Sequence, residues 1–195
     1  LFILYLSLAT AGQIFLNFQW DYLLLESGFL AIFLAGGPSR LIVLMFHWLL
    51  FRLRFMSGVG KLASGDPSWS NLTALNTYFE TQPLPHIGSW YAHQLPEWLL
   101  QAGVVLTLFS ELIVPFFIFL PRRWRLFAAA VTISMQLLII ATSNHNFINL
   151  LTIALCLFLL DDDCVKRITQ FRHQQIVEKL SLNFGWTKSL LSATG

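Results

Sequence analysis

Three runs of apolar residues are each long enough to cross a membrane as one helix, and this feature limits the fold more than any other. They are Leu41 to Val59, Leu99 to Leu120 and Trp124 to Ser143, and a spanning helix needs about 20 mostly apolar residues. Three further apolar segments are Leu1 to Phe18 and the shorter Leu23 to Ala35 and Phe147 to Leu160. The sequence therefore predicts an all-α, polytopic transmembrane helix bundle with about five to six apolar segments, in which the two short ones either cross or are re-entrant.

Composition agrees with a membrane protein and argues against other classes. Of the 195 residues, 56% are hydrophobic and 11% are charged, against about 45–50% and about 25% in soluble domains. The formal net charge of +2 gives no sign of nucleic-acid binding. Neither the two cysteines, Cys156 and Cys164, nor the five scattered histidines form a metal-binding pattern. We therefore expect membrane lipids as partners, no nucleic acid, no metal and no other cofactor.

The chain begins at Leu1, already inside an apolar run, so we expect a fragment of a longer protein. Residues 1–163 are interpreted as one membrane domain. Residues 164–195 are more polar and are expected to form a cytosolic or disordered tail, in which residues 166–182 have the mixed pattern of a short amphipathic helix.

Basic residues predict the orientation of the segments, because short loops rich in Lys and Arg face the cytosol. The loop from Pro121 to Arg125 has three arginines and is therefore predicted to be cytosolic. This puts residues 60–98 on the opposite, non-cytosolic side. Arg52, Arg54 and Lys61 do not fit, since they lie toward the outer end of their apolar segment. Either that segment does not simply cross, or these charges are held inside the protein.

The polar stretch within residues 60–98 combines prolines with aromatic residues. Four of the seven prolines lie there, so it cannot be one continuous helix. Its aromatic rings favour a position at the membrane interface, and we expect an ordered Pro- and aromatic-rich interfacial loop. Asn71 begins an N-glycosylation triplet, Asn-Leu-Thr, and is a candidate acceptor on the non-cytosolic side.

Charged residues inside apolar segments need a partner or a purpose, because inserting one costs about 2.5–3.5 kcal/mol. Glu111 lies four residues before a proline that is expected to kink its helix. A structural ion pair with Arg52 or Arg54 is the favoured interpretation, and a proton-handling or substrate role is the alternative. Asp21 and Glu26 flank a short segment, and structural pairing is favoured for both.

Lys61 and a group of asparagines are the other polar candidates. Lys61 ends an apolar segment, where lysines usually pair or reach toward the interface, although a desolvated lysine could also act as a base. Asn144, Asn146 and Asn149 lie at a polar turn between two segments, and such groups must bond within the protein at membrane depth. This favours helix-to-helix contacts for the asparagines, and leaves Lys61 and Glu111 as the only catalytic candidates.

Five strings in order resemble the lipase maturation factor family, over residues 15–163. They are Gln19 to Leu30, Met56 to Trp69, Tyr78 to Pro85, Trp90 to Pro96 and Asn144 to Thr152. The resemblance implies a non-enzymatic, chaperone-like membrane protein that assists the folding and assembly of secreted lipases. It would lie in the endoplasmic reticulum membrane of a eukaryote, or in the plasma membrane of a bacterium with another client. Client-facing residues would then be those of the loop, namely Asp66, Trp69, Tyr78, Glu80, Pro83, Pro85, Trp90 and His93.

A more distant similarity supports a second hypothesis. Gly58 to Leu62, followed by Trp69, is similar to the membrane domain of the vitamin K-dependent carboxylase, where a lysine in the corresponding string serves as catalytic base. Only Lys61 maps onto that role. The alternative function is therefore an integral membrane enzyme that uses Lys61, with Glu111, on a lipid-soluble substrate. A small-solute transporter is disfavoured because the sequence has no internal repeat.

Overall fold

In the computed structural model every described element is helical, and the described residues are 2–16, 18–37, 39–84, 86–145 and 147–161. The chain divides into two compact units, Leu1–Leu159 and Leu160–Gly195. Cys164, the tail at 164–195 and the amphipathic helix expected in it lie outside the described residues. The elements of the first unit are α1 (Phe2–Gly12), η1 (Gln13–Leu16), α2 (Gln19–Leu34), α3 (Arg40–Ala63), α4 (Pro67–Ser70), α5 (Ala74–Thr81), α6 (Ile87–His93), α7 (Glu97–Leu112), η2 (Val114–Phe119), α8 (Arg122–Thr142), α9 (Ile148–Cys156) and η3 (Leu157–Leu159).

Three helical segments are long and apolar enough to cross a membrane. They are Arg40–Ala63, Glu97–Phe119 and Arg122–Thr142, which coincide with the three long apolar runs. Phe2–Leu16 and Ile148–Leu159 are shorter apolar helices, and α2 covers the remaining segment. The predicted all-α fold with several apolar segments is therefore confirmed, and the length and composition of these helices indicate an integral membrane protein.

The local sequence explains where the long helices begin and end. Oγ of Ser39 accepts a 3.2 Å hydrogen bond from the backbone N–H of Ile42, so Ser39 caps α3. Pro115 has no N–H to donate to the carbonyl of Glu111. The α-helical bonding of α7 therefore stops at Leu112, and the chain continues as the 3-10 helix η2. A kink was expected at this proline, and what the structure has there is a change from α-helix to 3-10 helix.

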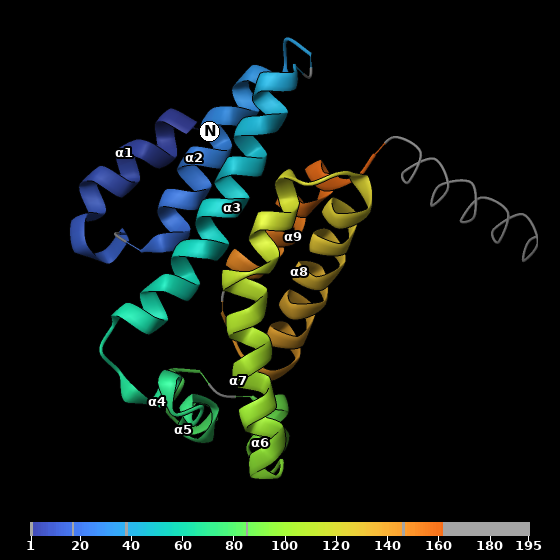
Figure 1. Ribbon diagram of the computed structural model, residues 1–195. Coiled ribbons are helices and arrows are strands. Elements are labelled where there is room, and N and C mark those ends of the chain that lie inside the picture. Colours follow the sequence, from blue (N-terminus) through green and yellow to red (C-terminus); the bar gives the residue numbers. More distant parts are fainter. Residues whose placement is uncertain (1, 17, 38, 85, 146, 162–195) are drawn as a thin grey trace, which may run out of the picture. The chain divides into compact units, whose positions relative to one another are not determined.

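Within the first unit, α3 is the central helix (Figure 1). It contacts α2 on one side and α7, η2 and α9 on the other. The rings of Phe46 and Phe158 stack with their centroids 4.0 Å apart. Gly58 is buried against α7, and a Cβ there would lie only 2.8 Å from Cδ2 of Leu112. In lipid such close approach, and not the hydrophobic effect, holds helices together.

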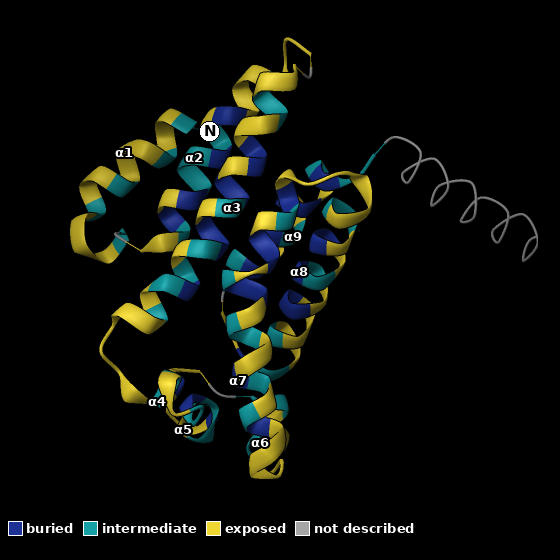
Figure 2. Cartoon of the chain, viewed as in Figure 1, coloured by how far each residue is buried: buried dark blue, intermediate teal, exposed yellow. Residues whose placement is uncertain are grey.

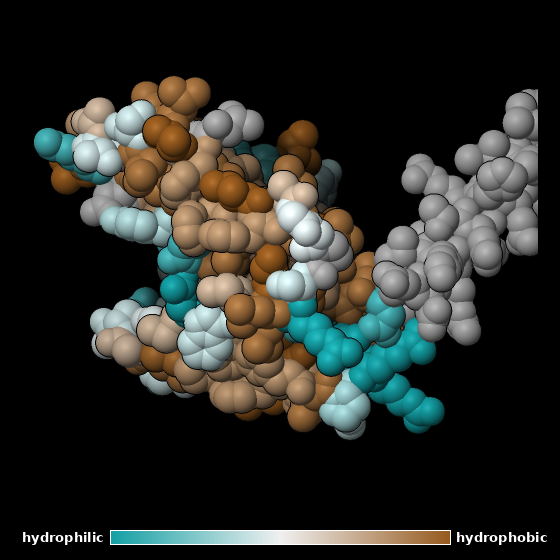
Figure 3. Space-filling model, turned by 90° about the horizontal axis from the view of Figure 1, so that it is seen from above, coloured by the Kyte–Doolittle hydropathy of each residue, from teal (hydrophilic) through white to brown (hydrophobic). Residues whose placement is uncertain are grey.

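Burial follows this arrangement. The buried residues gather on the facing sides of α3, α7, α8 and α9, whereas α1 is mostly exposed (Figure 2). Hydrophobic side chains cover most of the face drawn in Figure 3. Large hydrophobic side chains are also exposed along the long helices, among them Leu44, Trp48, Phe109 and Leu138, and such a surface is suited to lipid contact.

Residues 64–96, which we call the cap, connect α3 to α7. They form three short helices, α4, α5 and α6, and not one continuous helix, as their prolines predicted. α5 contacts both α6 and α7, and α6 contacts α8. Phe79 and Ala92 of the cap form a small core with Leu100 of α7. The cap is therefore an ordered element that packs on the bundle.

Candidate functional site

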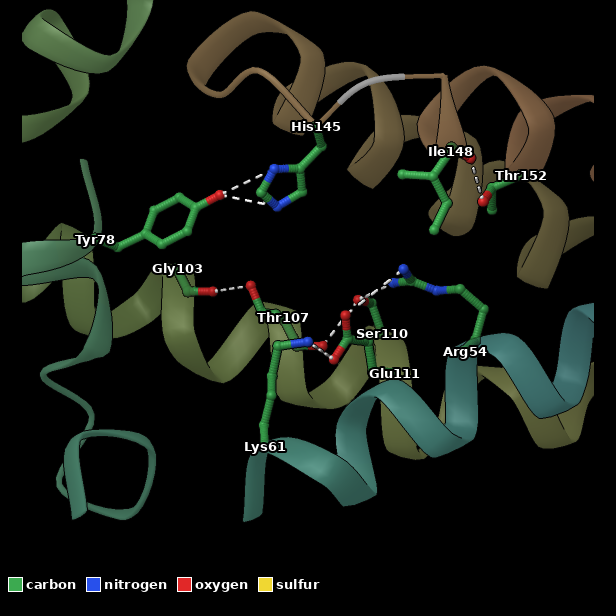
Figure 4. Close-up of polar contacts among 10 residues, drawn as sticks. All are labelled: Arg54, Lys61, Tyr78, Gly103, Thr107, Ser110, Glu111, His145, Ile148 and Thr152. Atoms are coloured by element: carbon green, nitrogen blue, oxygen red, sulfur yellow. Dashed lines mark hydrogen bonds and ion pairs between the residues drawn. The ribbon is translucent and has the colours of Figure 1, made fainter. Parts of the chain in front are cut away.

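A buried cluster of charges joins α3 to α7 (Figure 4). Oε2 of Glu111 accepts a 2.7 Å hydrogen bond from Nζ of Lys61, and Oε1 lies 3.6 Å from Nη1 of Arg54. The side chains of Arg54 and Glu111 are only 7% and 5% exposed. Of the two arginines considered as partners for Glu111, Arg54 is the one in contact with it. We call Arg54, Lys61, Ser110 and Glu111 the charge cluster.

The charge cluster extends into α7 and into the cap. Nη2 of Arg54 donates a 3.1 Å hydrogen bond to Oγ of Ser110, and that hydroxyl donates to the carbonyl oxygen of Thr107 at 2.9 Å. Nζ of Lys61 lies 5.3 Å from the centroid of the Trp69 ring, within the range of a cation–π interaction. Lys61 thus links the charge cluster to α4.

A second ion pair joins α2 to α3. Arg52 donates a hydrogen bond to the carboxylate of Glu26, and these side chains are 47% and 41% exposed. Asp21, in contrast, is buried and joins α1 to α2, because Oη of Tyr5 donates a 2.6 Å hydrogen bond to its Oδ1. The two carboxylates of this region therefore have separate partners.

These pairs account for the basic residues that do not fit the positive-inside pattern. Arg52, Arg54 and Lys61 each contact a carboxylate, and α3 runs unbroken from Arg40 to Ala63. α3 is thus one continuous helix, and each of these three basic side chains has a carboxylate partner, although that of Arg52 is half exposed.

The cap is tied to the turn between α8 and α9 through Tyr78. Its Oη lies 2.9 Å from Nε2 of His145 (Figure 4). Burial raises the pKa of the Tyr78 phenol above its ordinary value of 10.0. Loss of hydration lowers the pKa of His145 below 6.5. A hydrogen bond with the Asn144 backbone opposes this shift, and the positive charge of Lys61, the smallest effect, adds to it. His145 is therefore neutral at pH 7.

The polar turn makes further contacts with the cap. Oε1 of Gln82 accepts a 3.4 Å hydrogen bond from the backbone N–H of Asn144. Gly88 of α6 approaches a carbonyl oxygen of α8 so closely that a Cβ would collide with it. Asn149 is buried in α9, and Asn146 lies outside the described residues.

The remaining loop residues divide into structural and exposed ones. Oδ1 of Asp66 accepts a 2.9 Å hydrogen bond from the N–H of Ser68 at the start of α4, and this bond lowers the pKa of Asp66. Nε2 of His93 lies 2.9 Å from Oε1 of Glu80, which joins α6 to α5. Asn71, Pro83 and Trp90 are exposed, and Pro85 lies outside the described residues.

Several of these contacts were not anticipated from the sequence, first among them that of Lys61 with Glu111, for which only Arg52 or Arg54 was expected as partner. Ser110 carries a weak signal, since it is a polar residue beside Glu111 within an apolar helix. The Tyr5–Asp21 and Tyr78–His145 contacts join residues 16 and 67 positions apart, and no local pattern points to either of them.

The chemistry available at the charge cluster is electrostatic. Nζ of Lys61 gives a hydrogen bond to Glu111, and an ammonium group paired in this way has no lone pair with which to accept a proton. Among the residues that the structure describes, no group of three His, Cys, Asp or Glu side chains could hold a metal ion. The cluster is instead suited to holding opposite charges together in an apolar surrounding.

Comparison with known proteins shows which family the chain resembles. It matches the lipase maturation factor transmembrane domain over residues 1–167. Lipase maturation factor 2 of Xenopus laevis is 50% identical over 175 residues, which are 83% of this chain and 25% of that protein. The corresponding protein of Mus musculus is 43% identical over 212 residues, covering 99% of this chain and 30% of the relative. Lipase maturation factor 1 of Bos taurus is 38% identical over 173 residues, covering 83% and 31%.

No solved structure matches the chain. The chain spans between 25% and 31% of the length of these three relatives. The family match nevertheless covers most of its residues, including every element from α1 to η3. The chain therefore belongs to the lipase maturation factor family.

Proposed function

We propose that this chain is the membrane-embedded part of a factor that assists the folding and assembly of secreted lipases and has no catalytic activity of its own. Membership of the family supports this function, since the relatives carry the name lipase maturation factor. The membrane is that of the endoplasmic reticulum in a eukaryote. In a bacterium it is the plasma membrane, and the client is a different exported protein.

The observation that carries this proposal is an exposed, largely aromatic face formed by α6 of the anchored cap and the start of α7. Ile87, Trp90 and Tyr91 of α6 are 77%, 61% and 64% exposed and Trp98 of α7 is 68% exposed, and we call these four residues the aromatic face. On the other side of α6, Ser89 and Ala92 are buried. Large rings on a fixed element offer contact area at little cost in conformational entropy.

The predicted position of the cap on the non-cytosolic side of the membrane supports the same function. The predicted orientation puts the cap opposite the arginine-rich loop at 121–125, on the side where secreted proteins fold. The pairing of Arg52, Arg54 and Lys61 removes the objection to that orientation. On this orientation the cap and a secreted client lie on the same side of the membrane.

The test is secretion of an active lipase from cells that depend on this protein. The double variant Trp90→Ala/Tyr91→Ala is expected to lower secreted lipase activity while membrane insertion stays normal. The matched control is Leu44→Ala/Trp48→Ala, which removes two large exposed side chains from α3, away from the cap. Equal secretion with the two variants would contradict a docking role for the aromatic face.

The alternative of a membrane enzyme with Lys61 as base has less support, because Nζ of Lys61 is engaged by Glu111. The same secretion assay separates the two functions. Lys61→Arg keeps a cation opposite Glu111 but removes the amine, so normal secretion with this variant eliminates a catalytic lysine. Loss of secretion with normal insertion would count against simple docking.

A further inference from the structure

The guanidinium of Arg54 is buried but incompletely bonded. Its Nε has no hydrogen-bond acceptor among the described residues. Nη2 reaches Ser110, whereas Nη1 lies 3.6 Å from Glu111, which is too far for a hydrogen bond. An arginine presents five N–H donors, and leaving such donors unmatched in a buried position is costly. Arg54 therefore keeps an N–H donor that another acceptor could satisfy.

The charges of the cluster do not balance. Arg54 and Lys61 contribute two positive charges, and Glu111 contributes one negative charge. In the described part of the chain no other carboxylate lies within 4.0 Å of either cation. The cluster thus keeps one excess positive charge between two apolar helices, where an unmatched charge is unfavourable. One bound anion would cancel it.

We propose that Arg54 and Lys61 bind a small oxyanion, a carboxylate or phosphate group, which supplies the acceptor missing at Nε of Arg54 and the missing negative charge. Guanidinium groups match the geometry of both oxyanions. Arg54 and Lys61 both extend from α3 toward Glu111 (Figure 4). Lys61 lies seven residues beyond Arg54, about 10 Å along α3, and with 24% of its side chain exposed it is the accessible member of the pair. The oxyanion is either free in solution or the headgroup of an acidic lipid.

The first measurement uses the purified protein in detergent with four probes. Inorganic phosphate and acetate represent the free oxyanion, while phosphatidic acid and oleate in mixed micelles represent the headgroup. At least one probe is expected to raise the melting temperature above that in chloride of equal ionic strength. The soluble and the lipid probes tell the two sources apart. If none of the four exceeds chloride, the proposal is wrong.

The second measurement compares dissociation constants of the effective probe. Arg54→Lys is expected to weaken binding by at least roughly tenfold, since it removes Nε and the planar fork. Glu111→Gln is expected to tighten binding, because it removes the competing carboxylate. A purely structural cluster would not produce this opposite sign. Arg52→Lys is the matched control on the same helix and should bind like the wild type.

Two results would overturn the proposal: weaker binding by Glu111→Gln, or equal loss by Arg52→Lys and Arg54→Lys. Should Arg54→Lys or Glu111→Gln fail to fold, the dissociation constant of Lys61→Met is measured instead. The Lys61 side chain is partly exposed, so this change should disturb folding less. Binding weakened by roughly tenfold, the effect of losing one charge-assisted hydrogen bond, supports the site. Unchanged binding by Lys61→Met contradicts it.

Discussion

Nζ of Lys61 and Oε2 of Glu111 lie 2.7 Å apart, and their contact joins the last turn of α3 to the last turn of α7. Fifty positions of sequence separate the two residues, and the whole cap lies between them. Because Lys61 also faces the ring of Trp69, one side chain connects two spanning helices with the first helix of the cap.

Glu111→Gln is expected to lower the free energy of unfolding by about 3–5 kcal/mol, because it leaves two cations without their carboxylate. Lys61→Met should cost less, about 1–2 kcal/mol, since Glu111 keeps Arg54. Tryptophan fluorescence melting of the detergent-solubilised protein measures both. Glu97→Gln, the same change at the exposed start of α7, is the control. A Glu111→Gln protein that melts like this control would contradict a structural role of the cluster.

Gly58 and Gly60 are two positions apart on α3 and should respond oppositely to alanine. A Cβ at Gly58 would meet Leu112 and Glu111 at 2.8 and 3.0 Å, whereas at Gly60 nothing lies within 4 Å. Gly58→Ala is expected to destabilise by about 1–3 kcal/mol through overpacking. Gly60→Ala should be neutral or stabilise by up to about 1 kcal/mol through helix propensity. Equal melting temperatures would mean that α3 and α7 do not approach at Gly58.

Stability should depend on pH through His145. Its folded-state pKa lies below 6.5, so the unfolded chain takes up the proton more readily. The free energy of unfolding is therefore constant with respect to this group above about pH 6.5 and falls as the pH drops through that value. Melting temperatures from pH 8 to pH 5 measure the effect. The slope should be smaller in His145→Gln, and parallel profiles for the two proteins would contradict it.

Asn71 should carry a glycan when the protein is made in a eukaryotic cell. It is exposed at the end of α4, in a cap that we propose to be non-cytosolic. Treatment with an N-glycosidase should increase gel mobility. Asn71→Gln should abolish this shift, whereas Asn144→Gln, outside any acceptor triplet, should retain it. A wild-type protein without the shift would count against the proposed orientation.

The three long helices could be predicted because apolar length is a local property of the chain. Which arginine contacts Glu111 beside Lys61 could not be predicted, because Arg52 and Arg54 are equally available in sequence. Two residues along a helix differ by about 200° in direction, so only one of these arginines can face α7. The rotation of α3 about its axis, set by its packing against α2 and α7, decides that it is Arg54.

The cap shows a different limit of sequence reasoning. Its prolines and aromatic residues predicted order without a continuous helix, and α4, α5 and α6 agree. Helices of four, eight and seven residues are too short to display a helical period clearly. The contact of Tyr78 with His145 depends on where the turn after α8 lies in space, which no segment of the sequence encodes by itself.

The position of the carboxylates also orders events during synthesis. α3 carries Arg52, Arg54 and Lys61 but no acidic residue. Glu26 is translated before it, so the ribosome delivers one counter-charge early. Glu111 leaves the ribosome 50 residues after Lys61, when the cap has already been made. α3 therefore gains its second carboxylate only once α7 has been made, and until then Arg54 and Lys61 have no carboxylate partner.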